Sequence, residues 1–391
     1  MIKLDNKTNI ELIEKAHKEL TKSDTVDLSL SKSISSIEFG IIPFIIQFIA
    51  TWYNKTKGGR LILDLKKEDD LPEFYKLDYF FPSIVYCWER IIIDNNGKDL
   101  KPLLRVQNEL QYEIMRTQSP GGGPKMLLSC FDHLSVKKGL LNAFYIDGTF
   151  ISNEMQFDFA LDKAVRNVIF LNRELVINNY VSVHSEIISI IYELMKNTDD
   201  WGRTDIYNKP LNPNSRGLYL KLHRQKRENY LTGFENHEGL KDYFSSENFK
   251  SNTLDELYFL EISVYDTGIG FIQRYKSEQK NNFSITEHVG IIKERMLKYN
   301  TSATGVDKEI KGQGLDRIMK ILDNKGLFWL RTSNVSVFRN LRKNRYKENC
   351  SIEDVELFDW FNNSTTEFSN IELAQGSVIT LVYPISNIAN E

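Results

Sequence analysis

Residues 258–270, with the sequence YFLEISVYDTGIG, decide how this chain folds. The stretch before Asp266 is rich in aromatic, Leu, Ile and Val side chains and predicts a strand that ends directly at Asp266–Gly270 (DTGIG). A carboxylate at the end of a strand can accept a hydrogen bond from an amino group of a ligand, and the glycines let the backbone approach that ligand. A calcium-binding loop is excluded because no further acidic ligands follow at the required spacing.

A second group of polar residues lies upstream, on a predicted helix. Residues 185–196 show the apolar periodicity of an amphipathic helix. At about 100° per residue, Glu193, Asn197 and Asp200 fall on one face, because they are separated by four and three positions. On its own this pattern is typical of any helix with a solvated side, so its meaning depends on the neighbouring motifs.

A third motif, GQGL at Gly312–Leu315, opens a predicted helix over residues 315–322. The N–H groups at a helix N-terminus bind phosphate well, because they are unsatisfied and lie at the positive end of the helix dipole. The motif follows a long polar segment, residues 275–311. A last apolar strand is predicted over residues 377–383, directly after Gly376.

In this order, the three motifs resemble the nucleotide-binding motifs of the GHKL superfamily, the gyrase, heat-shock chaperone, histidine kinase and MutL-type ATPases. The resemblance spans about residues 155–386 and implies a two-layer α/β sandwich, the Bergerat fold, that binds ATP with Mg²⁺. It implies that Asn197 binds Mg²⁺, that Glu193 is the general base for hydrolysis and that Asp266 contacts adenine. The other nucleotide contacts that it implies are Asp200, Gly268, Gly270, Gly312, Gly314 and Leu315, with residues 275–311 as a mobile lid.

The chain is expected to contain two domains. Residues 151–391 are expected to form the GHKL-type sandwich, with an insertion near residues 224–256. Residues 1–150 are expected to form a smaller α/β domain for regulation or interaction.

Within this N-terminal part, a strand at 26–28, a helix at 36–54 and a strand at 60–65 suggest a βαβ unit with a parallel strand pair. The pattern loosely resembles a STAS-type regulatory domain. Residues 72–118 are predicted to be mainly helical, with a turn at 94–97.

Composition argues against several classes of protein. The chain has 50 Lys and Arg against 53 Asp and Glu, a net charge of −3, so charge does not indicate a nucleic-acid partner. The 3 cysteines are widely separated and fit the reduced thiols of a cytoplasmic protein. The apolar stretch 37–53 contains Glu38, Pro43 and Gln47, so a buried helix is expected rather than a membrane span.

Three functions remain open at this point. The first is a Mg-dependent ATPase whose nucleotide state switches the conformation of the N-terminal domain, of a protein partner or of a homodimer. The second is a protein kinase of the anti-sigma-factor or histidine-kinase type, which would use the same Glu193 as base. The third is a non-catalytic ATP-sensing scaffold. His184 is expected at the start of the helix that carries Glu193, which argues against a phosphoacceptor role.

Overall fold

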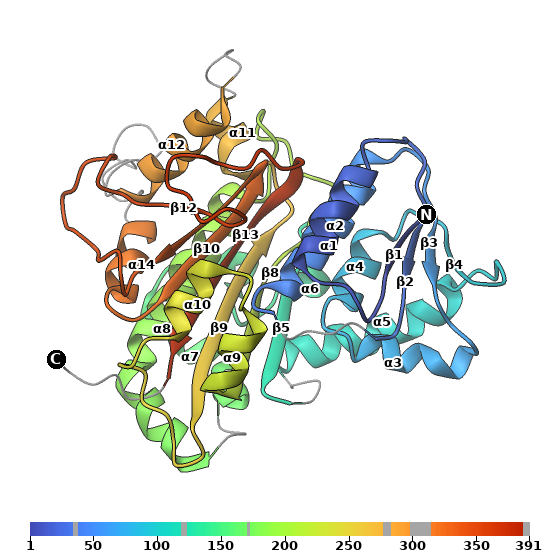
Figure 1. Ribbon diagram of the computed structural model, residues 1–391. Helices are drawn as coiled ribbons and strands as arrows, with labels where there is room; N and C mark the ends of the chain where they lie inside the picture. The colour runs from blue at the N-terminus through green and yellow to red at the C-terminus, as the bar shows by residue number, and fades with distance from the viewer. Residues whose placement is uncertain (34–37, 119–122, 170–172, 277–282, 298–313, 386–391) are drawn as a thin grey trace.

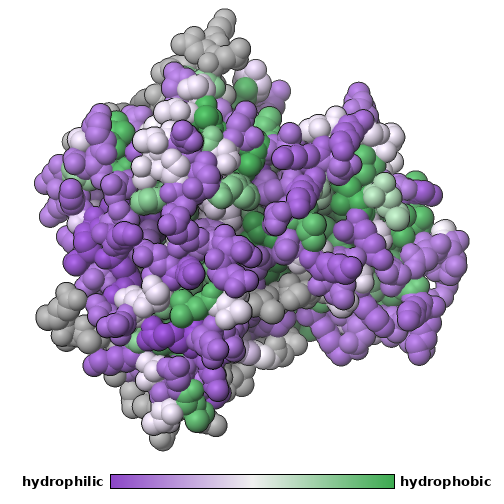
Figure 2. Space-filling view, viewed as in Figure 1, coloured by the Kyte–Doolittle hydropathy of each residue, from purple (hydrophilic) through white to green (hydrophobic). Residues whose placement is uncertain are grey.

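The computed structural model describes residues 1–33, 38–118, 123–169, 173–276, 283–297 and 314–385. They form a mixed α/β structure with a four-stranded sheet and a seven-stranded sheet (Figure 1). The expected α/β class is therefore confirmed. Figure 2 shows mostly hydrophilic side chains on one face of the molecule, with hydrophobic ones gathered where the N-terminal part meets the larger sheet.

The N-terminal sheet has the strand order β1-β2-β3-β4, and each neighbouring pair is parallel. Its strands are β1 (Ile2–Leu4), β2 (Leu28–Leu30), β3 (Leu61–Leu63) and β4 (Ile92–Asp94). The parallel pairing of β2 with β3 confirms the predicted βαβ unit. The helices of this part are α1 (Ile10–Glu19), α2 (Ile41–Lys55), α3 (Leu71–Tyr75), α4 (Phe80–Tyr86) and α5 (Lys101–Arg116), with a 3-10 turn at Glu68–Asp70.

The larger sheet has the order β12-β11-β10-β13-β9-β8-β5, and all neighbouring strands are antiparallel. Asp266 ends β9 between Arg216 and Ser377 of the two adjacent strands. The sheet begins before residue 150, where the domain boundary is predicted, because β5 forms its edge. The strands are β5 (Lys125–Cys130), β8 (Arg216–Lys226), β9 (Glu256–Asp266), β10 (Leu327–Ser333), β11 (Val335–Asn340), β12 (Phe358–Asp359) and β13 (Ala374–Pro384).

Different helices cover the two faces of this sheet. Helices α7, α8 and α14 pack on one face, and α9, α10 and the N-terminal α2 pack on the other. Alternate side chains of β9 enter the two hydrophobic cores that result, as a strand buried on both faces requires. The remaining elements are α6 (Val136–Gly139), the ribbon β6 (Tyr145–Ile146) and β7 (Thr149–Phe150), α7 (Glu154–Ile169), α8 (Arg173–Trp201), α9 (Arg227–Gly233), α10 (Glu238–Phe244), α11 (Gly270–Lys276), α12 (Ile285–Met296) and α14 (Gly314–Leu322).

Helix α2 lies between the two sheets and is buried at every position from Ile41 to Trp52. On one side the ring of Phe44 packs 4.4 Å from that of Trp329 in β10. On the other side Trp52 Nε1 donates a 2.6 Å hydrogen bond to the carbonyl of Val26, next to β2. The helix is apolar all round because it has no solvated face.

Two buried carboxylates fasten the N-terminal part to the larger sheet. The backbone N–H of Gly40, at the start of α2, donates to Glu261 Oε1 of β9 at 2.9 Å. Glu14 of α1 pairs with the fully buried Arg331 of β10 at 2.7 Å. Gly40 has φ of 75°, and a Cβ there would lie 2.8 Å from Thr380 Oγ1, so only glycine fits this contact.

The expectation that residues 72–118 are mainly helical is confirmed by α3, α4 and α5, although the short strand β4 also lies there. One sequence expectation is wrong. His184 does not start a helix, since α8 begins at Arg173. The predicted insertion at 224–256 consists of the ends of β8 and β9 with α9 and α10 between them.

The apolar stretch at 37–53 supplies the buried α2. In the parts of the chain that are described, no helix has both the length and the apolarity needed to cross a membrane.

A stack of aromatic rings continues from α2 across the outer face of the larger sheet. Trp329 stacks on Trp360 at 3.5 Å, and Trp360 lies 4.1 Å from the ring of His237. His237 Nδ1 accepts a 3.2 Å hydrogen bond from Leu240 N and caps α10. Burial lowers the pKa of His237 to about 4.

We expect His237 to make the protein less stable on acidification below pH 6.5. The unfolded imidazole takes up a proton near 6.5, whereas the folded one stays neutral until about pH 4. Acid therefore favours the unfolded state in this window by roughly 1.4 kcal/mol per pH unit. His237→Asn keeps an acceptor at the helix cap but does not titrate. Urea unfolding between about pH 7 and pH 4 should show a shallower loss for the variant, and equal slopes would contradict the assignment.

Candidate functional site

The polar face of α8, which carries Glu193 and Asn197, meets the GQGL motif at Gly314, where helix α14 begins. Glu193 and Asn197 lie one turn apart on α8, facing Gly314 at the first turn of α14. A Cβ on Gly314 would lie 2.8 Å from Glu193 Oε2 and 3.6 Å from Asn197 Nδ2. The absence of a side chain at Gly314 thus lets the Glu193 carboxylate lie against the first turn of α14.

Arg317, which the motifs did not single out, holds Glu193 in place. Its guanidinium donates to Glu193 Oε1 at 3.1 Å, to both oxygens of Glu154 at 2.9 and 3.0 Å, and to Ser189 Oγ at 2.8 Å. Burial acts to raise the pKa of Glu154, but the hydrogen bonds from Arg317 and Ser189 prevail and hold it below its ordinary value. Arg317 was not predicted from the sequence; its position one turn after Gly314 on a predicted helix is the signal that could have pointed to it.

The two oxygens of Glu193 therefore differ. Oε1 is held by Arg317, whereas Oε2 points toward Gly314 and has no hydrogen-bond partner among the described residues. The side chain of Asn197 likewise makes no hydrogen bond within the described part of the chain and is half-buried. Among the described residues, this pair of side chains therefore leaves Glu193 Oε2 and the Asn197 amide without a hydrogen-bond partner.

The Asp266–Gly270 loop meets the C-terminal end of α8, beyond Asn197. Gly202 directly follows this helix, and a Cβ on it would lie 2.9 Å from Asp266 Cβ. The N–H of Gly268 donates to Asp266 Oδ1 at 2.8 Å, which fixes the carboxylate at the strand end. Helix α8 therefore connects all three motifs, although they lie far apart in the sequence.

Neighbouring strands shape this loop closely. Gly270 has φ of 76°, and a Cβ on it would lie 2.8 Å from Thr332 Oγ1. Gly376 has φ of 68°, and its Cβ would lie 1.9 Å from the carbonyl oxygen of Asp266. Both positions require glycine because the backbone is left-handed and the space is already filled.

The other residues that the sequence predicted for the nucleotide site do not all face the Glu193–Asn197 pair. Asp200 is half-buried on the last turn of α8. The side chain of Leu315 packs into the hydrophobic core, so only its backbone faces the site. Gly312 and most of the predicted lid at 275–311 lie outside the described residues.

A buried ion network that the sequence did not reveal lies beside Asp200. Arg216 is fully buried and pairs with both oxygens of Asp132 at 2.8 Å. Asp199 accepts a 2.6 Å hydrogen bond from Tyr145 and a 3.0 Å bond from Arg203. The network fixes the last turn of α8 against β8 and the segment after β5.

No group of acidic, histidine or cysteine side chains able to hold a metal by itself occurs in the described ranges. Comparison of the chain with models of known protein families, with curated proteins and with solved structures found no match.

We expect Gly202→Ala to destabilise the protein by about 1–3 kcal/mol, because the added methyl group overlaps Thr198 O and the Asp266 side chain. Gly290→Ala is the control, since Gly290 lies inside α12 and no described atom outside the neighbouring backbone of that helix lies within 4 Å of its Cβ position. That change should stabilise by about 0.4–1 kcal/mol. Urea unfolding of the two variants measures both effects, and a Gly202→Ala protein as stable as wild type would contradict the packing described.

Proposed function

We propose that this protein binds ATP with Mg²⁺ through a GHKL-type site and hydrolyses it. The observation that carries the proposal is the meeting of three motifs along α8. Gly314 lies against Glu193 and Asn197, and Gly202 lies against Asp266. A carboxylate for an adenine amino group, an amide oxygen for Mg²⁺ and a helix terminus for phosphate then lie on one side of one sheet.

The chemistry of the described side chains fits the ion and the phosphates. Asn197 would supply an oxygen ligand of the kind Mg²⁺ prefers, in addition to phosphate oxygens and water. Mg²⁺ would neutralise phosphate charge during the reaction.

The protein's part in hydrolysis is then to position water and stabilise charge. Arg317 fixes one oxygen of Glu193, so that Oε2 can accept a proton from a water molecule near the start of α14. The N–H groups of that helix terminus stabilise negative charge on the phosphates. Asp266, held by Gly268, would select the amino group of adenine.

Direct contacts connect this site with the N-terminal part, which supports a role as a nucleotide-driven switch. The backbone N–H of Gln375 donates to Thr51 Oγ1 of α2 at 2.9 Å. Its side-chain Nε2 donates to the carbonyls of Thr267 and Gly268 at 2.9 and 2.7 Å. A change in the loop on nucleotide binding would therefore reach α2 through one residue, Gln375. The STAS-like role of residues 1–150, the cytoplasmic location and a protein partner or homodimer belong to this proposal.

We expect Glu193→Gln to reduce phosphate release from γ-labelled ATP by about 100-fold or more while ATP binding persists, because the variant keeps the shape but loses the base. Asp266→Asn should weaken ATP binding by about tenfold, the loss of one charge-assisted hydrogen bond. Removal of Mg²⁺ with EDTA should abolish release. Asp162→Asn, at a half-buried position of α7 where the carboxylate pairs with Arg166, is the matched control and should leave both properties unchanged.

The same assay separates the alternative functions. Label transferred to protein would identify a kinase of the anti-sigma-factor or histidine-kinase type. Tight binding with neither product would identify a sensing scaffold. ATP binding that is absent from wild type, or unchanged in both Asp266→Asn and Asn197→Ala, would contradict every version of the proposal.

A further inference from the structure

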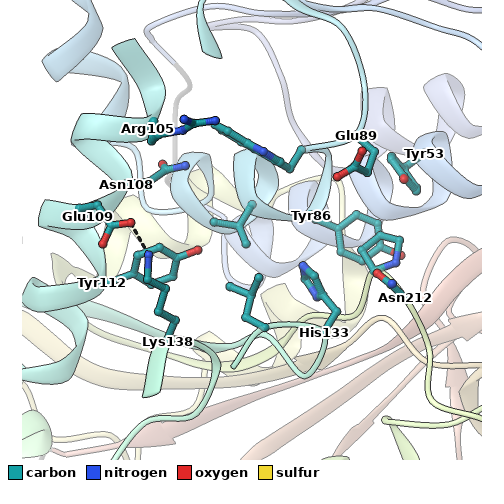
Figure 3. A pocket seen from close by; sticks show the side chains of 14 residues that line it. Tyr53, Tyr86, Glu89, Arg105, Asn108, Glu109, Tyr112, His133, Lys138 and Asn212 are labelled. Atoms are coloured by element: carbon teal, nitrogen blue, oxygen red, sulfur yellow. Dashed lines mark hydrogen bonds and ion pairs between the residues drawn. The ribbon is translucent and has the colours of Figure 1, made fainter. Parts of the chain in front are cut away.

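A cavity of about 470 Å³ lies between the N-terminal helices and the larger sheet, and none of the predicted nucleotide-site residues lines it (Figure 3). Its walls come from α2, α4 and α5 on one side, and from the segment after β5 and residues 212–213 on the other. The volume lies within the range of about 300–1,000 Å³ that is typical of small-molecule sites.

Aromatic rings form much of the wall and are held in place by other side chains. Tyr53 and Tyr86 meet edge to face at 5.4 Å, and Arg90 stands 4.8 Å over the ring of Tyr53. Tyr112 packs edge to face on the core residue Phe81 at 5.0 Å. Rings fixed in this way are ready to receive a flat molecule without first losing conformational freedom.

The two basic side chains of the cavity wall differ in whether they form an ion pair. Lys138 is neutralised by an ion pair with Glu109. Arg105 has no ion pair with any residue in the described ranges, and its side chain is exposed along the cavity. Figure 3 shows Arg105 and Glu89 on opposite sides of the cavity, with Glu89 beside Tyr53. A ligand with an anionic group can therefore pair with Arg105 and direct a donor such as a ring N–H toward Glu89.

The floor of the cavity is connected to the Asp266–Gly270 loop. His133 lines the cavity, and its Nδ1 lies 3.0–3.1 Å from the backbone oxygen and nitrogen of Asn214. The Asn214 side chain donates to Gly202 O at 2.9 Å and accepts from Thr267 Oγ1 at 3.0 Å. Gly202 and Thr267 both adjoin Asp266, so two hydrogen-bonded steps separate the cavity from the proposed adenine contact.

We propose that this cavity is a second ligand site, which binds a flat aromatic ring carrying an anionic group on Arg105, and that its occupancy changes the Asp266–Gly270 loop. The claim that the cavity binds a ligand does not depend on the proposed ATP binding. The regulatory part rests on the proposed function, since it assumes that the loop contacts nucleotide. The occupant would act as an effector, because the cavity contains none of the groups assigned to hydrolysis.

Two probes with the same ring and opposite charge test the binding part on the full chain. Indole-3-acetate should bind in saturation-transfer NMR and calorimetry, and tryptamine should bind at least tenfold more weakly. Arg105→Glu should reduce indole-3-acetate binding at least tenfold. Arg116→Glu is the control, because it makes the same change on the same helix about three turns away, outside the cavity. Equal binding of the two probes, an unaffected Arg105→Glu protein or no binding of indole-3-acetate at millimolar concentration would overturn the proposal.

Hydrogen exchange of the backbone amides at 266–270 tests the link without using ATP. Saturating indole-3-acetate should change exchange there in wild type, and Asn214→Ala should remove that change while the probe still binds. Unaltered exchange at the loop in wild type would overturn the coupling. Failure of ATP to bind, with these effects intact, would instead overturn the proposed nucleotide function alone.

Discussion

The burial of α2 between the two sheets is the interaction on which the rest of the structure depends. Antiparallel sheets of this size commonly have one solvated face, but here the outer face carries Trp329, Phe259 and other apolar side chains that require cover. Helix α2 supplies part of that cover, and the parallel N-terminal sheet packs behind it. The buried pair of Glu14 with Arg331 then fixes the two parts in one orientation, since a buried charge left without its partner costs about 3–5 kcal/mol.

On the opposite face of the larger sheet, helix α8 is the element that orients its neighbours. It is long enough to contact the start of α14 with its Glu193 turn and the Asp266 loop with Gly202 at its end. Its position is determined by ion pairs at two points, Arg317 near the middle and the Arg216 network at the end. Such pairs add orientation more than stability, because desolvation offsets much of their attraction. For a site built on one helix, orientation is the property that matters.

The Asp266–Gly270 loop is in contact with the surroundings of both α2 and α8. Gln375 connects it with α2, Asn214 connects it with the floor of the aromatic cavity, and Gly202 connects it with α8. A loop with several such contacts can have its conformation biased from more than one side, which is the physical requirement for coupling between separate sites. The tight glycine contacts at Gly270 and Gly376 favour discrete arrangements over continuous deformation.

The local elements could be predicted from the amino-acid sequence: β9 and its glycine loop, the amphipathic helix that carries Glu193 and Asn197, the helix that begins at Gly314, and the parallel β2–β3 pair. Periodicity and glycine spacing are local properties, so these could be read directly. The three-residue β4, the start of α8 at Arg173 and the joining of β5 to the larger sheet were missed, because short strands and edge pairings carry little local signal. Three features became apparent only in the three-dimensional fold: Arg317 holds Glu193, Arg216 pairs with Asp132 beneath α8, and an aromatic cavity forms between the two parts. Each of these joins residues far apart in the chain, and the burial that makes such contacts favourable exists only once both sheets have packed against α2.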